Sequence, residues 1–246
     1  MEHSSKSAHL QPKDRLAVAL DFPSAKLALD LVDRLDGSCL WFKVGMELYY
    51  GAGNSLVEAL RDRGFNIFLD LKLHDIPNTV AGAVRSATQA GASLLTLHAA
   101  GGPAMMSAAA EAVAATPSAP RLLAVTVLTS MDAHELTAVG VSASPAEQVL
   151  RLARLSRQSG IDGLVCSAEE VGALRAELGG EALLVIPGIR PSGSEIGDQK
   201  RVATPRAAIE QGASMLVVGR PITRAVNPAQ AAESILEEIA RATKPL

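Results

Sequence analysis

The 246-residue sequence predicts an α/β protein built as a single (β/α)8 barrel, the TIM-barrel architecture. Eight short apolar runs of strand-like length occur along the chain, and helical patterns separate them at intervals of about thirty residues. The main rival is a doubly wound open sheet. The first run continues as Leu20-Asp21-Phe22-Pro23 without a Gly-x-Gly-x-x-Gly motif, so the dinucleotide-binding version of that rival loses support.

The elements can be predicted in chain order from apolar periodicity. The expected strands are Leu16–Leu20, Leu40–Val44, Ile67–Leu73, Leu94–Leu97, Leu122–Leu128, Gly163–Cys166, Leu183–Ile186 and Met215–Val218. The expected helices are Ser24–Leu35, Leu48–Arg63, Asn78–Ala90, Ala104–Ala115, Pro145–Ser159, Glu169–Leu178, Pro205–Gln211 and Pro228–Arg241. Ser24, Asn78 and Ser144-Pro145 supply the caps or first-turn proline that begin helices.

The domain organisation follows from the same pattern. Residues 1–14 are polar and are expected to form a tail, whereas residues 15–246 form one barrel domain without an internal linker. The longest irregular segments are Thr129–Ser144 and Arg190–Thr204. Both come just after strands, where a barrel carries its working loops.

The composition restricts the partners and the location. With 48% hydrophobic residues, 20% charged residues and a formal charge of −3, the chain resembles neither a disordered nor a nucleic-acid-binding protein. Small molecules or copies of the chain itself are the expected partners. No secretory signal or membrane-spanning run is found, so a cytoplasmic location is expected. Cys39 and Cys166 are interpreted as two separate buried thiols.

Polar residues follow most of the predicted strands. Because barrel enzymes place their active sites at the carboxyl ends of the strands, these residues are the candidates for a site. The polar candidates are Asp21, Lys43, Asp70, Lys72, Asp75, His98, Thr129, Ser130, Arg190 and Arg220, and the turns after the seventh and eighth strands add Pro187, Gly188 and Gly219.

The third strand carries the densest chemistry, in Leu69-Asp70-Leu71-Lys72-Leu73-His74-Asp75. Alternation along a strand puts Asp70 and Lys72 on one face and the leucines on the other. Two charges side by side must be paired, solvated or used in chemistry, and Asp75 adds a carboxylate within reach of Lys72. The alternative is a solvated edge strand with an ion pair and a helix N-terminus.

The loops after the last two strands are suited to an anion. Barrels often bind phosphate there, and Gly188, Gly219 and Arg220 provide close backbone approach and a planar guanidinium. The alternative is a glycine turn with a solvent-exposed arginine. The segment Arg190–Lys200, which includes Gln199, is predicted to act as a lid over the ligand.

The spacing of the histidines and the charge of Lys43 both argue against a metal site. His74 and His98 do not form a His-x-x-x-His pair and are interpreted as hydrogen-bonded structural groups. Lys43 at the mouth would repel a metal cation. No metal site and no Ser/His/Asp or Cys/His catalytic group is therefore expected.

The motifs resemble those of the bacterial orotidine 5′-phosphate decarboxylase family from about Arg15 to the end of the chain. The most specific is Asp70-x-Lys72-x-x-Asp75 before Ile76-Pro77-Asn78-Thr79. Supporting segments are Leu20-Asp21, Phe42-Lys43-Val44-Gly45, Val127-Leu128-Thr129-Ser130, Pro187-Gly188-Ile189-Arg190-Pro191 and Val218-Gly219-Arg220-Pro221.

The resemblance implies a homodimeric barrel that decarboxylates orotidine 5′-phosphate (OMP) to UMP without metal or organic cofactor, at sites shared between subunits. It implies that Lys72 donates the proton within an array of Lys43, Asp70, Lys72 and Asp75 of the other subunit. The implied binding residues are Asp21 and Lys43 for the ribose, Thr79 across the interface, Thr129 and Ser130 for the pyrimidine, and Arg190, Gln199, Gly219 and Arg220 for the phosphate, with Pro187 lining the same mouth.

Physical reasoning supports this array. Loss of CO2 from C6 leaves a carbanion without a ring orbital to delocalise it, so the site must supply electrostatic stabilisation and a proton. The carboxylates around Lys72 favour its charged form. Repulsion between Asp70 and the substrate carboxylate would be relieved on loss of CO2. The distant phosphate can supply binding energy for lid closure.

Two alternative functions remain open, and one alternative role for Lys72 is disfavoured. A sugar-phosphate decarboxylase or aldolase of the same superfamily shares Asp-x-Lys-x-x-Asp but needs Mg²⁺ and carries an acidic metal ligand where this chain has Lys43. A noncatalytic barrel that binds a phosphoribosyl ligand would need the phosphate loops but not the alternating charges. A Schiff-base role for Lys72 is disfavoured, because nearby carboxylates would keep it protonated and poorly nucleophilic.

Overall fold

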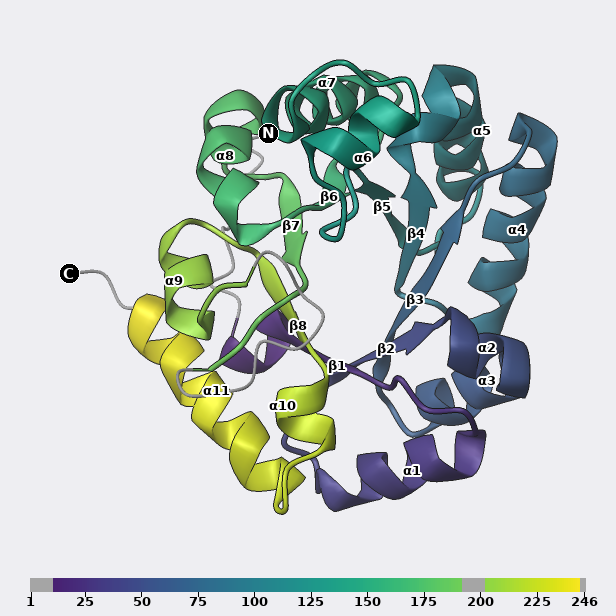
Figure 1. The fold of residues 1–246 in the computed structure, drawn as a ribbon. Coiled ribbons are helices and arrows are strands. Elements are labelled where there is room, and N and C mark those ends of the chain that lie inside the picture. The colour runs from purple at the N-terminus through teal and green to yellow at the C-terminus, as the bar shows by residue number, and fades with distance from the viewer. Residues whose placement is uncertain (1–10, 192–201, 244–246) are drawn as a thin grey trace, which may run out of the picture.

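The computed structural model describes residues 11–191 and 202–243. Its strands form one closed, entirely parallel barrel in the order β1 to β8, with β1 pairing with β8. Figure 1 shows the strands at the centre and the helices around them. The strands are β1 Leu16–Ala19, β2 Trp41–Gly45, β3 Asn66–Leu73, β4 Leu94–His98, β5 Arg121–Val125, β6 Gly163–Val165, β7 Leu183–Ile186 and β8 Met215–Val218.

The predicted (β/α)8 fold is confirmed, and every predicted strand is present with boundaries within three residues of those expected. The α-helices are α1 Ala25–Arg34, α2 Met46–Ala52, α3 Asn54–Asp62, α4 Pro77–Ala90, α5 Gly102–Ala114, α6 Ala133–Ala138, α7 Pro145–Gln158, α8 Val171–Leu178, α9 Pro205–Glu210, α10 Arg220–Thr223 and α11 Pro228–Thr243. The 3-10 turns are η1 Pro12–Arg15, η2 Ala99–Gly101 and η3 Ala168–Glu170.

Several helix predictions were wrong in detail. The single helix expected over Leu48–Arg63 is divided into α2 and α3 at Gly53, whose φ of 65° interrupts helical geometry. Helix α4 begins at Pro77 after Ile76, so Asn78 is not its cap. The loop Thr129–Ser144 contains α6, whose Asp132 and Glu135 form a capping box. The short α10 was also missed.

Other local predictions hold. The hydroxyl of Ser24 caps α1 by accepting from the amide of Leu27, and Ser144 caps α7 through a capping box with Glu147. Residues 11–14 of the predicted tail belong to the described chain, and η1 packs against α11 and the start of β8. The remaining residues of that tail, 1–10, lie outside the described part.

Apolar side chains pack in two layers on either side of the barrel wall. One layer lies between the strands and the helices and includes Leu69, with Leu71 and Leu73 packed against it. The other fills the barrel interior and contains Ala17, Ala19, Phe68, Leu94, Leu123, Val185, Met215 and Val217. The interior is therefore closed by packing below the mouth. Within the described ranges, no helix is long and apolar enough to cross a membrane.

Candidate active site at the barrel mouth

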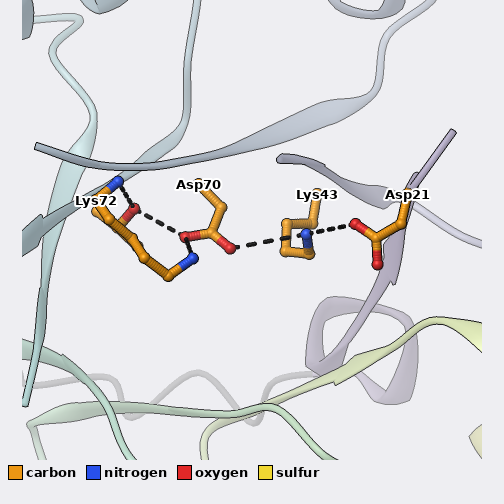
Figure 2. Close-up of polar contacts among 5 residues, drawn as sticks. Asp21, Lys43, Asp70 and Lys72 are labelled. Carbon is orange, nitrogen blue, oxygen red and sulfur yellow. Dashed lines mark hydrogen bonds and ion pairs between the residues drawn. The ribbon is translucent and has the colours of Figure 1, made fainter. Parts of the chain in front are cut away.

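A row of alternating charges crosses the mouth of the barrel at the ends of β1, β2 and β3 (Figure 2). The ammonium of Lys43 lies 2.9 Å from Oδ1 of Asp21 and 3.7 Å from Oδ2 of Asp70. The ammonium of Lys72 donates to Oδ1 of Asp70 at 2.8 Å. The order Asp21, Lys43, Asp70, Lys72 thus pairs each interior charge with an opposite charge on either side, which makes burial of the interior charges tolerable.

Strand register produces this row. Ala19 pairs with Lys43 and Gly45 pairs with Asp70, so neighbouring strands bring residues distant in sequence to the same height. Gly45 keeps space open, because a Cβ there would lie 3.0 Å from the Lys43 ammonium and 3.5 Å from the Asp21 carboxylate. The predicted face of Asp70 and Lys72 is confirmed, since the alternating leucines Leu69, Leu71 and Leu73 belong to the outer layer or pack against it.

Asp70 is the most enclosed carboxylate of the row. Its Oδ1 accepts from Lys72 and from the hydroxyl of Thr96 at 2.9 Å. Burial alone would raise the pKa of the Asp70 carboxyl, but the charges of Lys43 and Lys72 and the hydrogen bonds from Lys72 and Thr96 together lower it below its ordinary value. Asp70 is therefore held as an anion in the barrel mouth.

Lys72 has an unusual backbone. Its φ is +50°, a left-handed backbone conformation that residues other than glycine rarely adopt. The register between β3 and β4 also shifts between Leu69 and Leu73. The hydroxyl of Thr96 accepts a hydrogen bond from the Lys72 amide at 2.8 Å. Strain of this kind occurs at functional sites when the surrounding structure enforces it.

Asp75 and Thr79 lie apart from the row. Both are exposed, and the Asp75 carboxylate accepts from the amide of Ile76 at 2.6 Å. Within the described chain Asp75 forms no ion pair with Lys72, so the expected contact is not made inside one subunit. Ile76 beside it is 68% exposed, and Met46 and Tyr50 of α2 are also exposed.

A cavity of about 610 Å³ adjoins the end of the row formed by Asp21 and Lys43. Three arginines line it, Arg190, Arg220 and Arg224, together with Gly188, whose φ of 75° requires glycine. The remaining lining residues are Ala19, Asp21, Phe22, Lys43, Pro187, Val217, Gly219 and Thr223. The concentration of guanidinium groups suits an anionic ligand group.

A second cavity of about 200 Å³ lies above Phe68. It is lined by Lys43, Asp70, Lys72, Val125, Val127, Leu128, Thr129, Val165, Cys166, Pro187 and Val217. Lys43, Pro187 and Val217 also line the larger cavity, so the two adjoin. Charges on one side and apolar groups on the other suit a flat ring that carries one ionised substituent.

The predicted site residues are therefore mostly brought together. Asp21, Lys43, Asp70, Lys72, Thr129, Pro187, Arg190, Gly219 and Arg220 line the two cavities. Ser130 is exposed and lines neither cavity. Gln199 and most of the predicted lid fall outside the described residues.

Thr96, Thr223 and Arg224 were not identified from the sequence. Thr96 occupies an interior-facing position of β4, two residues from Leu94 and two from His98, and polarity at such a position was an available signal. Threonine is nevertheless common in strands, so that signal is weak. Thr223 and Arg224 belong to the end of α10, which was itself missed.

The histidine rings lie beside each other at the edge of the mouth, with centroids 5.4 Å apart. Burial lowers the pKa of His98 below its ordinary value, and the nearby His74 and Lys72 add to this effect against the opposing influence of Asp70. These influences favour the neutral imidazole form of His98.

The two cysteines lie in the interior of the fold. Cys39 and Cys166 are buried and form no disulfide, as expected. Burial raises the pKa of the Cys39 thiol to about 12. Among residues 11–191 and 202–243, no cluster of three or more His, Cys, Asp or Glu side chains is arranged to hold a metal ion.

Comparison with known proteins gives one consistent result. Residues 14–235 match the family described as "Orotidine 5'-phosphate decarboxylase / HUMPS family". The chain is 53% identical over 228 residues to the orotidine 5′-phosphate decarboxylase of Mannheimia succiniciproducens, covering 92% of this chain and 97% of that protein. It is 54% identical over 228 residues to the enzyme of the same name from Halorhodospira halophila, covering 93% and 97%.

Solved structures agree. The crystal structure of orotidine 5′-phosphate decarboxylase from Lactobacillus acidophilus superimposes with a TM-score of 0.83 at 42% sequence identity, covering 92% of this chain and 99% of that chain. An uncharacterized conserved protein from Geobacillus kaustophilus gives a TM-score of 0.81 at 40% identity.

Proposed function

The chain belongs to the orotidine 5′-phosphate decarboxylase family, and we propose that the charged row at its barrel mouth carries out the decarboxylation with Lys72 as proton donor. The reaction converts OMP to UMP and CO2 in pyrimidine biosynthesis. The observation that carries the proposed roles is the row Asp21, Lys43, Asp70, Lys72, which joins the two cavities of the mouth.

The two cavities accommodate the two ends of the substrate. The phosphate lies in the larger cavity, where Arg190 and Arg220 supply charge and donors and Gly219 gives close backbone approach. Asp21 and Lys43, at the junction of the two cavities, bind the ribose hydroxyls. The pyrimidine enters the smaller cavity with one edge toward Thr129 and C6 toward Lys72.

Bond cleavage leaves its electron pair on C6 while CO2 departs. The ammonium groups of Lys43 and Lys72 stabilise this developing negative charge, because they are already oriented by Asp70 before the reaction begins. Lys72 then transfers a proton from Nζ to C6, and the neutral amine recovers a proton from solvent. The anionic Asp70 lies beside the departing carboxylate, and its repulsion is relieved when CO2 leaves.

A second subunit completes the proposed site. Asp75 and Thr79 face outward at the start of α4, and an isolated subunit leaves the apolar side chain of Ile76 in water between them. Exposed Met46 and Tyr50 follow the neighbouring strand β2. Apolar groups gathered beside outward-facing polar ones suit an interface. In the proposed homodimer, Asp75 and Thr79 of each subunit enter the mouth of the other.

A subunit-mixing experiment tests the shared site. Lys72→Ala subunits and Asp75→Asn subunits are each expected to be inactive as homodimers. Mixing them under conditions that exchange subunits assembles heterodimers, in which one of the two sites carries both native residues. Partial recovery of OMP turnover is the expected result. Heterodimers demonstrated by mass spectrometry but without recovered turnover would refute the shared site.

Metal removal tests the reaction class. A metal cation bound beside Lys43 and Lys72 would meet two ammonium groups, so the proposed chemistry needs no divalent cation. Turnover of OMP is expected to be unchanged after exhaustive chelation and gel filtration. Loss of OMP turnover that Mg²⁺ restores would contradict the proposed metal-free reaction.

A further inference from the structure

Thr96 is a fully buried polar side chain that lies directly beneath the charged row. It is 0% exposed and lines neither cavity of the mouth, so it does not touch the substrate. Its hydroxyl lies within hydrogen-bond distance of both the Asp70 carboxylate and the Lys72 backbone amide. A buried hydroxyl is unlike its apolar interior neighbours Phe68 and Leu94 and requires partners of this kind.

The chemistry of the partners fixes the direction of both hydrogen bonds. The Lys72 amide can only donate, so the Thr96 oxygen accepts from it at 2.8 Å. The Asp70 carboxylate can only accept, so the single hydroxyl proton of Thr96 points to Oδ1 at 2.9 Å. One side chain on β4 therefore holds a backbone group and a side-chain group of β3.

The first of these bonds supports an unfavourable backbone. Lys72 is in the left-handed region, with φ of +50°, where the register between β3 and β4 is interrupted. Regular ladder bonds are lost at such an irregularity, and the Thr96 hydroxyl supplies the acceptor for the Lys72 amide in their place. The direction in which the Lys72 side chain leaves the strand depends on this conformation.

The second bond selects the orientation of Asp70. Oδ1 receives both the Thr96 hydroxyl and the Lys72 ammonium, which leaves Oδ2 to face the Lys43 ammonium at 3.7 Å. Rotation of the carboxylate would break the bond to Thr96. The hydroxyl thus keeps Asp70 between the two lysines, and it is among the groups that lower the pKa of this carboxyl.

We propose that Thr96 is a positioning residue for decarboxylation, which sets the strained backbone of Lys72 and the rotamer of Asp70 through one hydroxyl group. This inference rests on the proposed role of Lys72 as proton donor. Misplacement of a reacting group by about 1 Å can reduce a rate by on the order of 100-fold, so the hydroxyl is expected to affect kcat strongly.

The test replaces the hydroxyl by a methyl group in Thr96→Val. The expected result is a fall in kcat of about 100-fold with UMP affinity changed by less than about threefold, because the ligand contacts themselves remain. The acid limb of the pH profile of kcat/KM is expected to move to higher pH, since Asp70 loses a hydrogen bond to its charged form. Thr96→Ser keeps the hydroxyl and is expected to retain kcat within about threefold.

Thr126→Val is the matched control. Thr126 is also a buried threonine near a strand end, but its hydroxyl donates to the carbonyl of Val165 at 3.1 Å and touches no member of the charged row. Its loss is expected to leave kcat and the pH profile unchanged. Should Thr96→Val fail to fold, Thr96→Ala replaces it with the same expectation, and Thr96→Ser must exceed it in kcat.

Unchanged kcat and an unmoved acid limb in a folded Thr96→Val enzyme would overturn the proposal, as would equal losses in Thr126→Val. Lys72→Ala assayed alongside separates this inference from the role on which it depends. Turnover retained in Lys72→Ala refutes the role of Lys72. Turnover lost in Lys72→Ala but retained in Thr96→Val refutes only the role of Thr96.

Discussion

Partly buried cationic side chains occur at both ends of the barrel, but the groups that surround them differ between the two ends. At the mouth, Lys43 and Lys72 pair with carboxylates and line cavities. At the opposite end, Arg15 precedes β1 and Arg175 reaches the starts of β7 and β8. The Arg175 guanidinium donates to the carbonyls of Gly179, Gly180, Ala182 and Gly212 and to the hydroxyl of Ser214.

Arg15 is held in the same manner, by the carbonyls of Ala213 and Ser214 and the hydroxyl of Thr243. Burial lowers the pKa of both guanidinium groups, and for Arg15 the nearby Arg175 adds to the effect. Arginine remains charged regardless. These bonds connect helix and strand ends, which is a structural task.

The contrast teaches how to distinguish a buried charge that stabilises from one that reacts. The guanidinium N–H groups of Arg175 are bonded to backbone carbonyls, which cannot exchange a proton with them. The lysines at the mouth are instead oriented by ionised carboxylate side chains, and they line cavities where a ligand fits. Burial of a cation alone therefore does not indicate a site, whereas its partners and its access do.

The largest effect that distinguishes the two ends is the loss of kcat/KM expected from Arg220→Met at the mouth. A charge-assisted hydrogen bond contributes about 1.5–3 kcal/mol, so kcat/KM for OMP should fall by roughly 10- to 150-fold while Tm is unchanged. Steady-state kinetics and thermal unfolding measure the two effects. Arg241→Met, which removes an exposed arginine of α11, is the control and should change neither. An unaltered kcat/KM in Arg220→Met would place the phosphate elsewhere.

Arg175→Met should show the opposite behaviour. The carbonyls that lose their donor are expected to destabilise the fold by about 1–3 kcal/mol, which lowers Tm by several degrees, while the folded enzyme keeps its kcat. Arg154→Met is the control, because Arg154 pairs with Glu177 of α8 at the protein surface, where solvent screens the attraction. A fall in kcat at full folding would end the distinction between the two regions.

The smallest effect concerns pH. The pKa of His98 is lowered on folding, so below about pH 6.5 the unfolded chain binds the proton more readily than the folded one. Stability should therefore fall as the pH drops from 7 toward 5. His98→Gln should flatten this dependence of Tm, whereas Arg175→Met should lower Tm equally at each pH. An unchanged slope in His98→Gln would assign the dependence to other groups.

Much of this arrangement was predictable from sequence. Alternating apolar runs and helical patterns gave the barrel, and the carboxyl ends of the strands gave the charged row, because both depend on local periodicity and one topological rule. The contact of Thr96 with Asp70 could not be derived, since it depends on the register between β3 and β4 and on the irregularity at Lys72. The helix division at Gly53 was similarly hidden within a continuous apolar pattern.

Other parts of the candidate site concern the proposed second subunit. Asp75 was expected near Lys72, yet within one subunit its carboxylate accepts a hydrogen bond from the amide of Ile76. Contacts made by a second copy of the chain cannot be predicted from the local sequence pattern. The resemblance to a family was what suggested a shared site, and subunit mixing remains its test.

The most direct measurement for the central claim is the change in absorbance of OMP on incubation with folded Lys72→Ala enzyme beside the wild type. Circular dichroism and UMP binding establish that the variant is folded with an intact phosphate site. Removal of the ammonium group is expected to abolish turnover, because both the proton and a principal positive charge near C6 are lost. Turnover of OMP by Lys72→Ala near the wild-type rate would contradict the account.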